Sequence, residues 1–212
     1  MKRYVASLLA ALAALPGCSS TVLVSVPPRV ELRSYGTLGI VQFASNSDGA
    51  IDVLATRQLQ EQVQAAQPGT RFVELGSRQA LLGAVGAAQL DADAARRIGA
   101  KFGVAAIFVG DLVYAEPKAD VKVTDLARLD GAVRAEIRGD ISARLIEAAS
   151  GASVWSSSAW ARRQIGGVRV SADQGISGSV SSNADPRRDM VPALVYQLTH
   201  DFRPSSVRQP AK

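Results

Sequence analysis

The chain has 212 residues, of which 47% are hydrophobic and 20% charged, and its formal net charge is +5. Behind the apolar N-terminal segment, roughly 180 residues are enough for one globular domain with a core of ordinary size. Aromatic residues make up only 5% of the chain, and no block of Lys or Arg interrupts it. We therefore expect no nucleic-acid partner, because such a surface usually combines a basic stripe with aromatic side chains.

Residues 1–17 have the pattern of a secretory signal peptide. Lys2 and Arg3 provide positive charge, and the following run Val5–Leu15 is apolar apart from one serine and carries no charge. As a helix this run would be about 16 Å long, roughly half of the apolar thickness of a bilayer, so it is too short for a transmembrane helix. Residues 1–17 carry two basic and no acidic residues, so cleavage would lower the net charge from +5 to +3.

Cys18 is the only cysteine of the chain, and it follows Leu15-Pro16-Gly17. This pattern resembles a bacterial lipobox, although Pro16 replaces the usual small residue. We expect the Cys18 sulfur to carry lipid, with acyl groups such as palmitate, because a lone cysteine makes no internal disulfide and two or three acyl chains hold a protein stably on a membrane. Ser19 then favours the outer membrane, with the domain facing the periplasm. The alternative is an ordinary signal peptide and an incidental buried cysteine.

The first half of the mature chain alternates strand and helix patterns. Residues 18–30 are rich in Ser, Thr, Val and Pro and predict an extended tether whose valines could add an edge strand. Periodicity, caps and breakers then predict a strand at 37–44, a helix at 50–67, a strand at 71–75, a helix at 77–89, and a helix capped by Asp91 and closed by Gly103.

The second half is dominated by strand patterns. Residues 104–114 are the most apolar stretch and predict a central strand, while residues 133–145 alternate apolar and polar side chains and predict a long strand that pairs with 152–162. Residues 166–185 are rich in Gly and Ser and predict a weakly structured excursion. An amphipathic helix follows, with Asp189 as its expected cap and Pro204 as its stop, and residues 205–212 are expected to be a flexible tail.

This order of elements predicts a single α/β domain over residues 31–204, with a mixed β-sheet flanked by helices. Three segments, in order, add a family resemblance: Gly39-Ile40-Val41-Gln42-Phe43, Ile98–Gly110 and Leu145–Ser156. They resemble the first strand, the helix with its central strand, and a hairpin turn of the curli secretion channel lipoproteins (CsgG-like), the flagellar lipoprotein FlgO and the penicillin-binding-protein activator LpoB. Gln42 departs from the family's proline, and Glu147 and Ser150 stand where Asp and Thr are more frequent. The matched positions identify an architecture, not a ligand site.

Few residues of the chain suit catalysis or metal binding. His200 is the only histidine and is expected at the exposed end of the last helix. Gly99-Ala100-Lys101 lacks the flanking residues of a phosphate loop, and Asp91 and Asp93 fit a helix start. We therefore expect no enzymatic activity, no catalytic residue, no cofactor and no metal site, which leaves lipidation at Cys18 as the predicted site chemistry.

These observations predict a lipid-anchored, non-enzymatic lipoprotein that binds or helps assemble a cell-envelope protein complex. The alternative is a self-associating subunit of a CsgG-like outer-membrane secretion pore, in which residues 118–138 and 163–185 would form amphipathic hairpins. A membrane-spanning strand needs about nine to eleven residues, whereas each arm here offers about five alternating positions. The sequence leaves open whether the two stretches are hairpins or loops.

Overall fold

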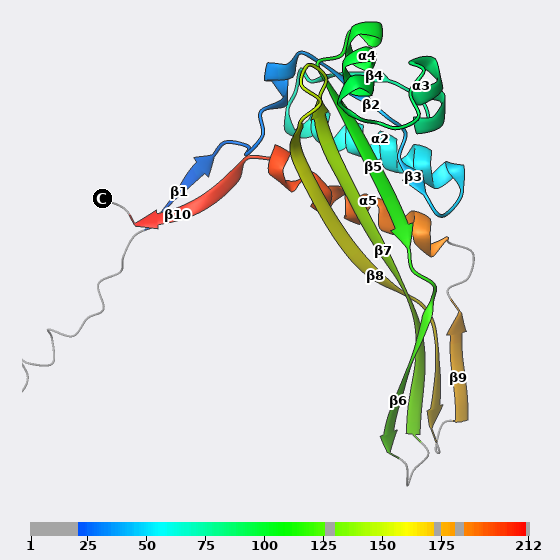
Figure 1. The fold of residues 1–212 in the computed structure, drawn as a ribbon. Helices are drawn as coiled ribbons and strands as arrows, with labels where there is room; N and C mark the ends of the chain where they lie inside the picture. The colour runs from blue at the N-terminus through cyan, green and yellow to red at the C-terminus, as the bar shows by residue number, and fades with distance from the viewer. Residues whose placement is uncertain (1–20, 126–129, 172–174, 181–184, 211–212) are drawn as a thin grey trace, which may run out of the picture. The chain divides into compact units, whose positions relative to one another are not determined.

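The computed structural model describes residues 21–125, 130–171, 175–180 and 185–210 (Figure 1). Contacts divide the chain into a larger unit, Pro28–Arg203, and a smaller one formed by the segments up to Pro27 and from Pro204. The larger unit is a single α/β domain with a mixed sheet flanked by helices, which confirms the predicted fold class.

The sheet of the domain has the strand order β4-β2-β5-β7-β8-β9, with β3 beside β5 and β6 beside β7. Its first part is parallel, because each strand is followed by a helical crossover, and the part beginning at β7 is antiparallel because hairpins connect its strands. The strands are β2 (Thr37–Ile40), β3 (Ala44–Ser45), β4 (Arg71–Glu74), β5 (Ala106–Tyr114), β6 (Lys118–Asp125), β7 (Asp130–Glu147), β8 (Ser153–Ser171) and β9 (Gly175–Val180).

Helices cover both faces of the sheet. Buried residues of α2 (Gly49–Ala66) and α5 (Pro186–Leu198) form the main core with one face, and those of α3 (Arg78–Ala84) and α4 (Ala92–Phe102) form a second cluster with the other. The 3-10 turns η2 (Leu32–Tyr35) and η3 (His200–Phe202) add Leu32 and Phe202 to the main core. Among the helices of the described chain, none is long and apolar enough to cross a bilayer.

Strand β5 lies at the centre of this arrangement because both of its faces are apolar. Phe108 and Leu112 point into the main core, and Ile107 and Val109 point into the second cluster. Phe108 also packs at 5.9 Å from Trp155 and 5.8 Å from Phe202, measured between ring centroids. This two-sided burial explains why residues 104–114 are the most apolar stretch of the mature chain, which predicted a central strand.

Two helix predictions need correction. Helix α3 ends at Ala84 instead of continuing to Gln89, because the chain turns at Gly86, which has a φ of 62°. Helix α5 is capped by Asp185, whose side chain accepts a hydrogen bond from the backbone N–H of Arg187, so Asp189 lies inside the helix. Asp189 instead forms a salt bridge with Arg163 at 3.0 Å.

Residues 118–138 and 163–185, which the sequence left open as hairpins or loops, both form hairpins over the described residues. Strand β6 pairs with β7 from Lys118↔Glu136 to Asp125↔Asp130, and β8 pairs with β9 from Gly166↔Val180 to Ser171↔Gly175. The expectation of a weakly structured excursion over 166–185 is therefore wrong for the part that the structure describes. Backbone pairing needs only N–H and C=O groups, which a Gly- and Ser-rich segment supplies even where its apolar alternation is short.

The smaller unit is a two-stranded ribbon. Strand β1 (Thr21–Val26) pairs antiparallel with β10 (Ser205–Pro210), from Thr21↔Pro210 to Val26↔Ser205. The tether and the flexible tail that the sequence predicted thus pair with each other over these residues, which corrects the prediction of a free tail at 205–212 as far as Pro210. Cys18 and residues 1–17, the predicted signal peptide, lie outside the described residues.

Candidate functional site

The sheet face that carries α3 and α4 is only partly covered. These helices bury Ile107, Val109 and Ile146, whereas farther along β5 the side chain of Val113 is 52% exposed. We call the uncovered area, which Figure 1 shows along β5, β7 and β8, the open face. Its outward side chains are Asp111, Val113, Arg138, Asp140, Ser142, Arg144, Ser156, Ser158, Trp160 and Arg162.

Strand register arranges these side chains in rows. Asp111 stands opposite Ser142, which stands opposite Ser158; Val113, Asp140 and Trp160 form the next row. The inward neighbours on β7, Ile137, Ile141 and Leu145, are buried in the main core. The period of two along β7 therefore produces one apolar face under α5 and one polar face toward solvent, as the sequence predicted.

One end of the open face is hollowed and polar. The hollow has a volume of about 420 Å³ and is lined by side chains from α3, β5, β7 and β8, among them Arg78, Asp111, Arg144, Ser156 and Ser158. Ser77 caps α3 and places Arg78 in its first turn, where a guanidinium nitrogen of Arg78 lies 2.8 Å from Asp111 Oδ1. This pair neutralises Asp111 and leaves hydroxyl groups and Arg144 to face a ligand.

The other end of the open face is built around Trp160. The Trp160 side chain is 53% exposed, and the guanidinium carbons of Arg138 and Arg162 lie 5.1 and 5.4 Å from its ring centroid. Asp140 fixes Arg138, accepting from its Nε at 2.9 Å, and this hydrogen bond raises the pKa of Arg138 above its usual value. Two guanidinium groups therefore lie within cation–π distance of the Trp160 ring.

The open face has a surplus of positive charge. Arg78 pairs with Asp111 and Arg138 with Asp140, while the described residues provide no salt-bridge partner for Arg144 or Arg162. Tryptophan and arginine are the residues that contribute most often to protein–protein binding energy. The arrangement can therefore bind a partner that presents carboxylates around an apolar group.

The residues that the sequence singled out as candidates for chemistry lie at positions that the fold itself explains. His200 is exposed, with Nδ1 3.7 Å from Asp201 Oδ1 at the end of the last helix, as expected. Asp91 caps α4 by accepting from the Ala94 N–H at 2.8 Å, which lowers its pKa. Gly99 packs closely on Ala148, since a Cβ on Gly99 would lie 2.6 Å from the Ala148 Cβ. Among the described residues, no group of three or more His, Cys, Asp or Glu could hold a metal ion.

No family model matches this chain. No curated protein matches it either. Solved structures similar to it include the PelC dodecamer from Paraburkholderia phytofirmans, with 11% identity, a TM-score of 0.40, and coverage of 87% of this chain and 98% of that one. Lipoprotein GNA1162 from Neisseria meningitidis has 17% identity, a TM-score of 0.34, and coverage of 77% and 97%.

The LpoB C-terminal domain from Salmonella enterica is similar at 12% identity, with a TM-score of 0.34 and coverage of 73% of this chain and 93% of that one. Bacterial lipoproteins are among the proteins whose solved structures this chain is similar to. At these identities the likeness concerns the fold alone.

The sequence did not single out Trp160, Arg138 or Arg162. Arg138 and Trp160 belong to different strands, and only the register between β7 and β8 brings them together. The available signal was the alternation over 133–145, which placed Arg138 and Arg144 on the wet face. It did not say which side chains of the partner strand would lie beside them.

Proposed function

We propose that the protein is a lipid-anchored, non-enzymatic lipoprotein of the bacterial outer membrane that binds or helps assemble an envelope protein complex through the open face. The observation that carries this proposal is Trp160, exposed beside Arg138 and Arg162 on a face that α3 and α4 leave uncovered. The lipobox-like segment ending at Cys18 supports the anchor.

The geometry favours a protein partner with an acidic binding patch. An exposed tryptophan on a strand loses little conformational freedom on binding, and it offers a large apolar area. Arg144 and Arg162, which have no salt-bridge partner within the described part of the chain, would meet carboxylates of the partner, which would raise the rate of association and fix its orientation. The hydroxyl groups of the hollow would add hydrogen bonds at the rim of such an interface.

The test is capture of a stoichiometric envelope partner by the lipidated chain, compared between two variants. Trp160→Ala removes the aromatic group of the open face. Tyr196→Ala is the matched control, because Tyr196 is 57% exposed on α5 and also carries an arginine, Arg203, 3.6 Å from its ring centroid. We expect loss of the partner with Trp160→Ala only. Equal capture by both variants, or repeated absence of a stoichiometric partner, would contradict the proposal.

A second candidate function, a subunit of an oligomeric secretion pore, is favoured by the hairpins. Strands β6, β7, β8 and β9 run side by side over the segment where β7 residues 131–135 pair with β8 residues 166–170. Strands β7 and β8 have 18 and 19 residues, more than the about nine to eleven that cross a bilayer, whereas β6 has 8 and β9 has 6. Detergent-extracted protein that forms a large ring and makes liposomes leak would favour the pore, and a monomer or dimer without leakage would exclude it.

A further inference from the structure

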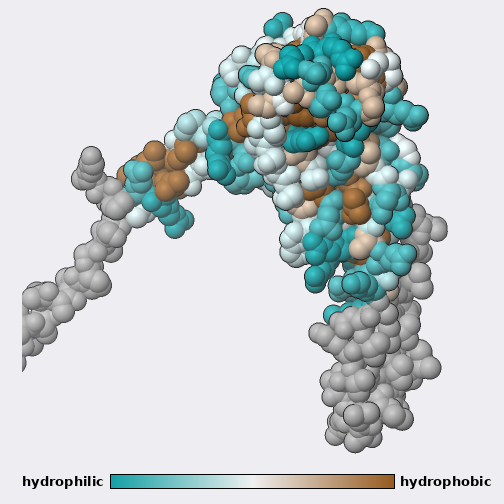
Figure 2. Space-filling model, viewed as in Figure 1, coloured by the Kyte–Doolittle hydropathy of each residue, from teal (hydrophilic) through white to brown (hydrophobic). Residues whose placement is uncertain are grey.

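We infer that the β1–β10 ribbon is a second membrane contact, which lies on the lipid surface beside the anchor with a valine face turned toward the acyl chains. Figure 2 shows the hydrophobic surface over this ribbon. The inference rests on the proposed lipidation of Cys18 and adds a surface that the anchor alone does not provide.

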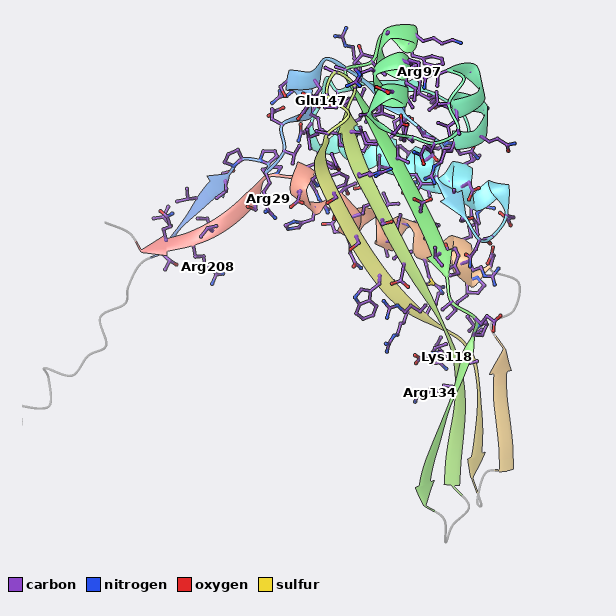
Figure 3. All side chains as sticks on the ribbon, in the orientation of Figure 1. Arg29, Arg97, Lys118, Arg134, Glu147 and Arg208 are labelled. Atoms are coloured by element: carbon purple, nitrogen blue, oxygen red, sulfur yellow. The ribbon has the colours of Figure 1, made fainter. Side chains whose placement is uncertain are left out.

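The register makes the ribbon amphipathic. Residues directly opposite each other in an antiparallel pair project from the same face. Val22 stands opposite Gln209, Val24 opposite Val207, and Val26 opposite Ser205, so four valines share one face, which we call the valine face. The other face carries Thr21, Leu23, Ser25, Ser206 and Arg208, the last of which is labelled on β10 in Figure 3.

The valine face is exposed to solvent. Val22 is 53% and Val207 47% exposed, and Val24 and Val26 are also exposed. Within the described residues of the smaller unit, β1 and β10 are its two elements, so the unit supplies no second layer to cover this face. An isolated two-stranded ribbon is marginally stable in water. A surface that covers the valines would therefore stabilise the pairing of β1 with β10.

Chain length favours lipid as the covering surface. Thr21 follows Cys18 by three residues, which span at most about 10 Å when extended. If acyl chains on Cys18 enter the bilayer, the start of β1 lies in the headgroup region. The ribbon is about 20 Å long at about 3.4 Å per residue, and interfacial segments bury their apolar faces about 5–10 Å deep at this boundary.

The size of the valine face disfavours a second copy of the chain as the covering surface. Four half-exposed valines offer on the order of 200 Å² of apolar surface. A stable protein–protein interface buries about 800 Å² on each partner. A contact with lipid does not need this minimum area. Once the anchor holds the ribbon at the bilayer, the ribbon meets lipid at a high effective concentration.

The test places an environment-sensitive fluorophore on the ribbon of the lipidated protein. Cys18 carries lipid in the mature form, so Val24→Cys introduces the only free thiol, and Leu23→Cys is the matched control because Leu23 is 67% exposed on the opposite face. In vesicles of phosphatidylethanolamine and phosphatidylglycerol, a quencher attached to the acyl chains should quench the label at 24 and leave the label at 23 almost unchanged. Val22→Thr with Val207→Thr should reduce the quenching at 24, since threonine keeps the β-branched shape and adds a hydroxyl.

The outcome separates this inference from the proposed anchor. Mass spectrometry of the N-terminal peptide and vesicle flotation report lipidation independently of the label. Lipidated protein that floats with vesicles but leaves the label at 24 in water would overturn the ribbon contact and leave the anchor intact. A label at 24 that is shielded from water, is not quenched by lipid and crosslinks to its counterpart in another molecule would overturn it in favour of a second copy.

Discussion

The buried side chain of Gln67 accepts a hydrogen bond from the backbone N–H of Leu32, with 2.7 Å between Oε1 and the nitrogen. Its Nε2 donates to the carbonyl oxygens of Val30 at 2.6 Å and of Phe202 at 3.1 Å. One side chain at the end of α2 therefore joins the first and last segments of the domain.

Substitution of Gln67 should weaken this junction. Gln67→Leu has a similar size but leaves the Leu32 N–H and two carbonyl groups without their partner, so we expect a loss of about 2–4 kcal/mol in the free energy of unfolding. Gln64→Leu, on the exposed side of the same helix, is the control; it loses one hydrogen bond, from Nε2 to the Thr70 carbonyl at 3.3 Å, and should cost much less because Gln64 is exposed to water. Chemical denaturation of both variants measures the difference, and equal stabilities would show that water replaces the lost bonds.

The close approach of Gly110 to Phe43 gives a second prediction. A Cβ on Gly110 would lie 2.1 Å from the Phe43 ring. Gly110→Ala should therefore cost about 1–3 kcal/mol through overpacking. Adding Phe43→Leu should recover part of the loss by giving the methyl group room. Gly83→Ala, in α3 with open space around it, should instead raise stability slightly. Thermal melts of the three variants rank their stabilities. A Gly110→Ala variant with the stability of the wild type would contradict the close packing of Gly110 on Phe43.

The central strands of the sheet were predictable because the order of apolar and polar side chains along them follows which side chains are buried. The alternation over 133–145 correctly placed Ile137 and Leu145 in the core and Arg138 in solvent. Strand β9 lies in an arm with only about five alternating positions, and β10 has no apolar period, because Gly- and Ser-rich or polar segments form ladders largely through their backbone. Their pairing depends on which distant segment lies beside them, which local periodicity does not encode.

The candidate site shows the same limit. The sequence predicted the arginines of the open face as polar positions, but it did not predict which side chains they contact. Arg78 meets Asp111 only because the first turn of α3 lies beside β5, and Arg138 meets Trp160 only through the β7–β8 register. Gln67 likewise fitted the end of a predicted helix, and its three bonds to distant backbone groups had no sequence signal.

Tyr114 gives a prediction about alkaline pH. Its side chain is buried and its hydroxyl donates to the Arg187 carbonyl at 2.7 Å, and burial raises its pKa above the ordinary value of 10.0. The folded state therefore keeps Tyr114 protonated at pH values where the unfolded chain ionises. The stabilisation from Tyr114 is fully present below pH 10.0 and is lost as pH rises through the higher folded pKa.

Tyr114→Phe should remove this pH dependence. The variant loses about 1 kcal/mol near neutral pH with the hydrogen bond to Arg187. Above pH 10.0 its stability should fall less steeply than that of the wild type, because it lacks the ionising group. Urea denaturation at several pH values compares the two, and parallel curves above pH 10.0 would show that Tyr114 ionises equally in both states.

The last prediction concerns lipidation of Cys18, on which the proposed localisation depends. Cys18→Ser removes the sulfur that would accept the lipid, so we expect an uncleaved or soluble form in place of membrane-bound protein. Ser19→Ala is the control, since it leaves the Cys18 sulfur in place, and it should be lipidated like the wild type. Fractionation of membranes with mass spectrometry of the N-terminal peptide measures both. Because two or three acyl chains dominate attachment, a Cys18→Ser variant that still fractionates with membranes like the wild type would refute lipidation as the anchor.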